Sequence, residues 1–128
     1  MPKTAVRPAK GKAIGPYSPG IAVGELVFVS GQIPLDPDTG KLVEGGISAQ
    51  ARQSLENLKG VLAAAGLGFE HVVKTTIFLT SMADFAEVND VYKRYVGEPY
   101  PARSTIAVAA LPMGAQVEIE VIASRAAK

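Results

Sequence analysis

The stretch VVKTTIFLTSMADFAEVNDVYKRY, residues 72–95, decides the fold, because it contains a strand and a helix in direct succession. Residues 72–80 are rich in β-branched and aromatic side chains and predict a buried strand. Residues 81–84, SMAD, resemble a capping box with aspartate in the acidic position. Four residues then recur at helical spacing, Phe85, Val88, Tyr92 and Tyr95. We therefore expect a helix that ends near residue 96, before the breaking sequence GEPYP.

A second helical pattern lies upstream of this stretch. Ser48 suits the N-cap position of a helix, and small or apolar residues follow it at alternating spacings of four and three. These residues are Ala51, Leu55, Leu58, Leu62 and Ala65. Because Gly66 and Gly68 stop the pattern, the sequence predicts a helix between residues 48 and 65.

Further strands are expected on both sides of these elements. They cover residues 21–23, 26–30, 104–111 and 116–124. The last of them alternates apolar and polar side chains, as a half-buried strand does. The element order is therefore β-β-α-β-α-β-β, which predicts the α+β class: a two-layer sandwich with two helices on one face of a mixed sheet. The other face of the sheet must then meet water or another chain.

The composition fits one folded domain over residues 1–128, with residues 1–13 as a flexible or irregular arm. Apolar residues make up 48% of the chain and charged residues 20%, which is typical of globular proteins. So many apolar residues in a short chain indicate that some apolar surface meets another subunit. The net charge of +1 favours neither nucleic-acid nor membrane binding.

Several classes of site are not supported by the residues present. The chain has no cysteine, so it has neither a disulfide framework nor thiolate chemistry. The single histidine, His71, begins a strand and is interpreted as a surface or strand-edge residue, and no His/Asp/Glu cluster has metal-ligand spacing. Neither a signal-peptide pattern nor an apolar run of about 20 residues, the length that spans a bilayer, is found. We therefore expect a soluble, cytoplasmic protein.

Two charged residues stand out as candidates for chemistry. Arg103 lies between the GEPYP turn and an apolar strand, where its planar fork suits a carboxylate. Glu118 lies in the apolar strand VEIEVIA, where burial would raise its pKa and allow it to act as a general base. Spacing alone leaves two other interpretations open: both residues are ordinary solvent-face charges, or they pair with each other.

Longer motifs connect these residues to a known family. The sequence PARSTIAVAALP at residues 101–112, followed by VEIE at 117–120, resembles the signature of the RidA/YjgF family. Further matching stretches are AIGPYS at 13–18, VFVSGQIP at 27–34, VVKTTIFL at 72–79 and MADFAEVN at 82–89. Together these stretches cover nearly the whole chain in the expected order.

The resemblance implies a fold, an assembly and an activity. The fold is chorismate-mutase-like α+β, and the assembly is a homotrimer with clefts between neighbouring subunits. The activity is that of a 2-iminobutanoate/2-iminopropanoate deaminase, an enzyme that hydrolyses reactive 2-imino acids to 2-keto acids and ammonia. The expected ligands are therefore small imino and keto acids, and no cofactor or metal is implied.

Site residues are implied by position in the motifs. Arg103 would hold the substrate carboxylate, and Glu118 would orient or deprotonate the attacking water. Tyr17 would line the cleft and hydrogen-bond water or substrate.

Four further residues would form the cleft wall or contact the substrate. Ser30 and Gly31 would contribute hydroxyl and backbone groups, and Asn89 would contribute a polar contact from the second helix. Thr105 would present backbone groups to the imino nitrogen, at a position where many relatives have cysteine. Because imine hydrolysis needs no sulfur nucleophile, we expect this departure to alter the shape of the pocket and to leave activity in place.

Other functions stay open at this point. The same cleft could bind small carboxylates without turnover, as in a regulator, although such a protein has no need for Glu118. Some relatives have been described as ribonucleases or translation inhibitors, but the sequence contains no RNA-binding motif. Chorismate mutase activity would rest on fold analogy alone.

Overall fold

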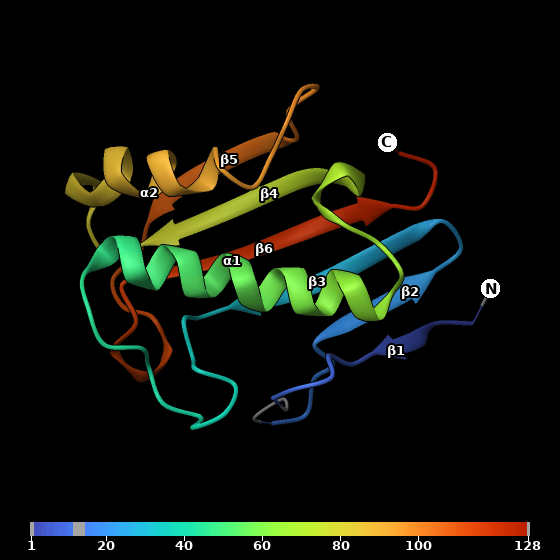
Figure 1. Ribbon diagram of the computed structural model, residues 1–128, viewed down its shortest axis with the longest axis horizontal. Coiled ribbons are helices and arrows are strands. Elements are labelled where there is room, and N and C mark those ends of the chain that lie inside the picture. Colours follow the sequence, from blue (N-terminus) through green and yellow to red (C-terminus); the bar gives the residue numbers. More distant parts are fainter. Residues whose placement is uncertain (1, 12–14, 128) are drawn as a thin grey trace.

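Within residues 2–11 and 15–127, which the structure describes, six strands form one sheet and two α-helices cover one of its faces (Figure 1). In this computed structural model the strands are β1 Thr4–Val6, β2 Gly20–Val23, β3 Leu26–Gln32, β4 Val72–Leu79, β5 Ala102–Ala107 and β6 Val117–Ser124. Their order across the sheet is β1-β2-β3-β6-β4-β5. Strands β4 and β5 run parallel and the other neighbouring pairs run antiparallel. The predicted α+β class with a mixed sheet is confirmed.

Helix α1, Ile47–Ala64, packs the predicted apolar face onto the sheet. Leu55, Leu58 and Leu62 are completely buried. The predicted N-cap is wrong, because the helix begins after Gly46 and no side chain caps it. Ser48 instead donates a 2.6 Å hydrogen bond from its hydroxyl to the Glu87 carboxylate, and this bond ties α1 to the second helix.

Helix α2, Phe85–Tyr92, is shorter than the sequence predicts. A short 3₁₀ turn, Met82–Asp84, precedes it, and the Ser81 hydroxyl accepts a hydrogen bond from the backbone of Ala83 there. After Tyr92 the backbone N–H groups of residues 94 and 95 bond to carbonyls three residues back, so the chain tightens into a turn. The aromatic spacing that continues to residue 95 therefore belongs to this turn and not to the helix.

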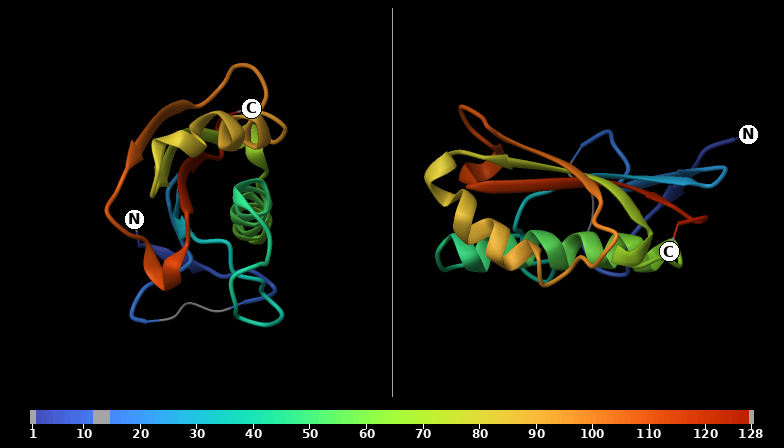
Figure 2. Two further views of the ribbon diagram at one scale, coloured as in Figure 1. Left: turned by 90° about the vertical axis from the view of Figure 1, so that its left-hand side faces the viewer. Right: turned by 90° about the horizontal axis from the view of Figure 1, so that it is seen from above.

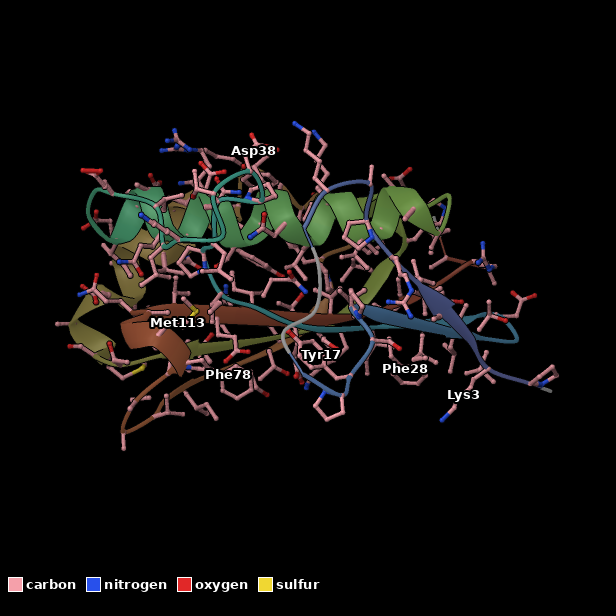
Figure 3. The ribbon with its side chains drawn as sticks, turned by 90° about the horizontal axis from the view of Figure 1, so that it is seen from below. Lys3, Tyr17, Phe28, Asp38, Phe78 and Met113 are labelled. Carbon is pink, nitrogen blue, oxygen red and sulfur yellow. The ribbon has the colours of Figure 1, made fainter. Side chains whose placement is uncertain are left out.

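The two faces of the sheet have different surroundings. Both helices lie on one side of the sheet (Figure 2), and the strand residues beneath them form the core. In β6, Val117, Ile119 and Val121 point to that side and are buried, while Glu118 and Glu120 point to the other. We call this other side the open face, because no helix among the described residues covers it. Tyr17, Phe28 and Phe78 lie on it (Figure 3).

Two predicted boundaries need correction. Thr4–Val6, inside the segment expected to be irregular, forms β1 and pairs antiparallel with β2, and Val6 joins the core. Positions 1, 12 and 13 of that segment, and residues 13 and 14 of the AIGPYS motif, lie outside the described residues. The fifth strand covers residues 102–107 and not 104–111, which places Arg103 inside a strand. No helix in the described part of the chain is long and apolar enough to cross a membrane.

Candidate active site

The seven predicted site residues fall into two groups on opposite faces of the sheet. Asn89, Arg103 and Thr105 form the helix-side group, at the outer strand β5 and the adjoining helix α2. The open-face group consists of Tyr17, Ser30, Gly31 and Glu118.

Arg103 is fixed on the helix side by contacts with α2. Its position in β5 pairs with Thr75 of β4, a buried residue that faces the helices. The guanidinium Nη1 donates a 2.6 Å hydrogen bond to Asn89 Oδ1. Its central carbon lies 5.5 Å from the ring centroid of Phe85 and 5.2 Å from that of Tyr92. Both distances fall within the range of cation–π attraction.

These contacts leave Arg103 able to bind an anion. The residue remains exposed to solvent although its guanidinium is held in place. The two rings attract the cation but do not act as hydrogen-bond acceptors for its N–H groups. The hydrogen bond to Asn89 uses one donor nitrogen of the guanidinium. The remaining N–H groups form the fork that matches a carboxylate.

Thr105 is two residues further along the same strand and faces the same side. It pairs with Ile77 of β4, which is buried in the core. Its hydroxyl oxygen is buried and has no hydrogen-bond partner in the described part of the chain. A buried polar group without a partner costs about 1–3 kcal/mol. The hydroxyl therefore adds an unused donor and acceptor to the helix-side group.

The carboxylate of Glu118 lies beside Gly31, in space that the side chain of any other residue at position 31 would fill. It projects from β6 onto the open face, opposite Phe78 of β4, and it is half-buried. A Cβ atom added to Gly31 would overlap the Glu118 carboxylate and would lie 2.8 Å from its carboxyl carbon. Burial raises the pKa of the Glu118 carboxyl above its usual value, and the nearby negative charge of Glu120 raises it further. A carboxylate with a raised pKa is a stronger base than an ordinary carboxylate, which is the property that a general base needs.

Ser30 holds the loop that carries Tyr17. Its hydroxyl donates a 2.6 Å hydrogen bond to the Ser18 carbonyl, and its backbone N–H donates to the Pro19 carbonyl. Tyr17 itself is half-exposed over the open face (Figure 3). A hollow of about 220 Å³ lies beside this loop, lined in part by Ser18, Phe28, Ser30 and Glu120. Ser30 therefore fixes the loop position in this chain, and its hydroxyl hydrogen is already used.

Arg103 and Glu118 are not brought together in a single protomer. They form no ion pair among the described residues, and they lie on opposite faces of the sheet. The two residues therefore do not pair with each other within one protomer. The view of Arg103 as an ordinary solvent-face charge also fails, since helix α2 holds its guanidinium.

Phe85 and Tyr92 are the residues at this site that sequence reasoning missed. The sequence analysis used both only as markers of the second helix, through their helical spacing. The signal that could have found them is the spacing of Phe85, Asn89 and Tyr92 at i, i+4 and i+7, which puts two rings and an amide on one helical face.

A larger depression of about 550 Å³ lies between helix α1, residues 67–70 and the chain around the end of α2. Its lining includes Arg52, Lys59, Leu67, Arg94 and Tyr95, and it contains none of the predicted site residues. Within residues 2–11 and 15–127, no group of three or more acidic or histidine side chains is placed to hold a metal ion. The candidate chemistry therefore lies in the helix-side and open-face groups and not in this depression.

Comparison with known proteins agrees with the fold and indicates an activity. The family model described as Endoribonuclease L-PSP matches residues 6–125. Protein DfrA from Myxococcus xanthus is 58% identical over 114 residues, which cover 88% of this chain and 87% of that protein. The 2-iminobutanoate/2-iminopropanoate deaminase of Mus musculus is 51% identical over 111 residues, covering 87% of this chain and 82% of the mouse protein.

A solved structure from the same comparisons contains a small carboxylate ligand. The structure of TdcF from E. coli with bound serine has a TM-score of 0.90 and 42% sequence identity to this chain. The match covers 96% of this chain and 99% of the E. coli chain.

Proposed function

The chain belongs to the RidA/YjgF family, whose model is described as Endoribonuclease L-PSP, and we propose from this premise that it hydrolyses reactive 2-imino acids to 2-keto acids and ammonia. Its substrates are 2-iminobutanoate and 2-iminopropanoate, as in the name of the mouse relative. The observation that carries the proposal is the exposed guanidinium of Arg103, which helix α2 holds at the outer strand of the sheet.

Arg103 binds the carboxylate that every 2-imino acid carries. A bidentate pair between guanidinium and carboxylate fixes both the position and the orientation of the substrate. The serine bound to the E. coli relative carries the same group on its α-carbon. Neutral imines lack this carboxylate, so Arg103 selects imino acids against them.

Glu118 activates the water. The Glu118 carboxylate accepts a proton from water while the water oxygen bonds to the carbon of the protonated imine, which gives a neutral tetrahedral intermediate. Glu118 returns this proton to the nitrogen, the C–N bond breaks to release ammonia, and the hydroxyl loses its proton to solvent as the carbonyl of the 2-keto acid forms. A raised pKa brings the Glu118 carboxyl closer to neutral pH, where it works best as a base.

The active site forms between subunits of a homotrimer. Because Arg103 and Glu118 lie on opposite faces of one sheet, a substrate can meet both groups only if a second copy supplies one of them. Strand β5 is the last strand of the sheet that the described residues form, so its outer edge can approach the open face of another protomer. Apolar side chains exposed on that face, Leu26 and Phe28, favour such an association.

The decisive experiment measures ammonia and 2-ketobutanoate released from 2-iminobutanoate that threonine dehydratase generates in the assay. The wild type should accelerate release above the spontaneous rate, and Arg103→Ala should abolish the acceleration while the assembly stays intact in analytical ultracentrifugation. Arg103→Lys keeps the charge and loses the planar fork, so partial activity is expected from that variant. Full activity of Arg103→Ala would sink the proposal.

The same preparations test the two remaining functions. Binding of 2-ketobutanoate without any release of ammonia from the imine would favour a non-catalytic regulator of the same site. The family description favours a second candidate, cleavage of RNA, which a labelled RNA in the same buffer tests. Cleavage, or binding that weakens steeply with salt, would support that activity.

A further inference from the structure

One face of helix α2 carries three side chains that contact the guanidinium of Arg103. Phe85, Asn89 and Tyr92 follow one another at i, i+4 and i+7, and each contacts this group. We call these three residues the guanidinium cradle. Two rings approach the central carbon to 5.5 and 5.2 Å, and the amide oxygen of Asn89 accepts one N–H.

We propose that the guanidinium cradle sets the orientation in which Arg103 receives the substrate carboxylate, and that Phe85 and Tyr92 are positioning residues for the reaction. The inference rests on the proposed function, because it assigns a role to residues that act through Arg103. Neither ring needs to touch the substrate.

Tyr92 is the part of the cradle that the fold itself fixes. Its hydroxyl donates a 3.0 Å hydrogen bond to the Thr75 hydroxyl, and both residues are buried. Thr75 is the residue of β4 that pairs with Arg103 of β5. The ring beside the guanidinium is therefore tied to the strand next to the one that carries the arginine. A shift of the ring would break a buried hydrogen bond, so its position is well defined.

The use of aromatic rings in this position has a chemical advantage. Arginine loses much rotamer freedom when it binds a ligand, and holding it in place beforehand reduces that cost. A carboxylate partner would hold Arg103 as firmly, but it would neutralise the charge that the substrate needs. Phe85 and Tyr92 attract the cation and leave its charge unpaired.

The first test separates positioning from folding by matched substitutions. Phe85→Leu and Tyr92→Leu should each raise KM about three- to tenfold, with kcat changed less than twofold, because each removes one cation–π contact. Tyr95→Leu is the control, since Tyr95 packs against Phe69 and not against Arg103. Tyr92→Phe keeps the ring but loses the hydrogen bond to Thr75 that fixes it, so its KM should lie between those of the wild type and Tyr92→Leu.

Phe85→Leu keeps the test decisive if Tyr92→Leu fails to fold, because Phe85 is only half-buried. The affinity for 2-ketobutanoate, measured by calorimetry, should follow KM in each variant. Unchanged affinity in Arg103→Ala would overturn the proposed function itself. Lost affinity in Arg103→Ala together with unchanged affinity in Phe85→Leu would overturn the cradle alone.

A second test asks whether the cradle can hold a guanidinium that is not attached to the chain. Millimolar guanidinium ion should restore part of the activity of Arg103→Ala, since the rings and Asn89 remain. Adding Phe85→Leu to Arg103→Ala should weaken this rescue at least threefold, while adding Tyr95→Leu should leave it unchanged. Equal rescue in both double variants would refute the role given to the ring.

Discussion

Arg103 Nη1 of strand β5 lies 2.6 Å from Asn89 Oδ1 of helix α2, and this hydrogen bond joins the outer strand of the sheet to the helix packed beside it. Among the strands that the structure describes, β5 has one neighbour, β4. The hydrogen bond between Arg103 and Asn89 therefore helps to hold strand β5, which pairs with the sheet along one edge.

Asn89 should govern substrate binding more than turnover. Asn89→Ala removes a hydrogen bond to a charged group, worth about 1.5–3 kcal/mol when it is fully formed. Because both partners are accessible to solvent, we expect a rise in KM of about tenfold, at the lower end of that range. Asn89→Asp should raise KM further, because its carboxylate would neutralise Arg103. Steady-state kinetics checks both, and a lower KM in Asn89→Asp would contradict this view.

Glu118 should set the acid limb of the pH profile. Glu118→Gln should lower kcat about 10²–10⁴-fold, the usual contribution of a general base. In the wild type, kcat/KM should fall at a pH above the ordinary carboxyl range, because burial and the charge of Glu120 raise the Glu118 pKa. Glu120→Gln removes the like charge and should move this limb to lower pH. If the acid limb of kcat/KM stays at the same pH in Glu120→Gln, a group other than Glu118 must cause it.

The same carboxyl should reduce stability at neutral pH. Its pKa is higher in the folded chain than in the unfolded chain, so the folded state binds more protons and loses stability as the pH rises through the raised pKa. Glu118→Gln should therefore have the larger free energy of unfolding at pH 7. The difference should vanish below the ordinary carboxyl value of 4.5. Urea denaturation at several pH values measures it, and a gain that persists at pH 3 would point to a different cause.

Any side chain at position 31 should reduce activity, because it would displace the Glu118 carboxylate. The backbone at Gly31 is not in the left-handed region, so alanine introduces no backbone strain. Its Cβ would displace the carboxylate, and we expect Gly31→Ala to reduce kcat at least tenfold with the fold retained. Gly97→Ala is the control, because no atom lies within 4 Å of the added methyl group. Equal activities of the two variants would show that the Glu118 carboxylate need not occupy its present position.

Two inactive variants should restore each other when their subunits exchange. If Arg103 of one protomer works with Glu118 of the partner subunit, a mixture of Arg103→Ala and Glu118→Gln forms some sites with both groups intact. Random exchange at equal amounts gives about one quarter of the wild-type activity, since each of the two contributions is intact half the time. The mixture is denatured, refolded together and assayed, and persistent inactivity would place both groups in one protomer.

The fold could be predicted because each element has a strong local signal. The β-branched run of β4 and the leucine spacing of α1 lie where the sequence placed them. The errors occur where tertiary contacts override the local pattern. Ser48 bonds to Glu87 and does not cap α1, and Thr4–Val6 becomes a strand only because β2 offers it an edge. Contacts between distant segments of this kind leave no local signal in the sequence.

The candidate site could be predicted only as a set of residues. The motifs identify Arg103 and Glu118, but their spacing of 15 positions contains no information about which face of the sheet each occupies. That depends on the register of β5 and β6 against β4, which the sequence does not specify. The proposed role of Tyr92 is harder to predict for another reason, since an aromatic residue on the inner face of a helix is expected to serve the core.

The placement of Arg103 and Glu118 on opposite faces has a consequence for how the protein behaves in dilute solution. A folded monomer would bind an anion at Arg103 on one face of the sheet and carry the base Glu118 on the other face. Such a monomer would therefore be inactive. Specific activity should therefore drop once the protein is diluted below the point where protomers part, with no loss of secondary structure. For the proposed two-subunit site, the concentration of the protein would then set the fraction of active enzyme.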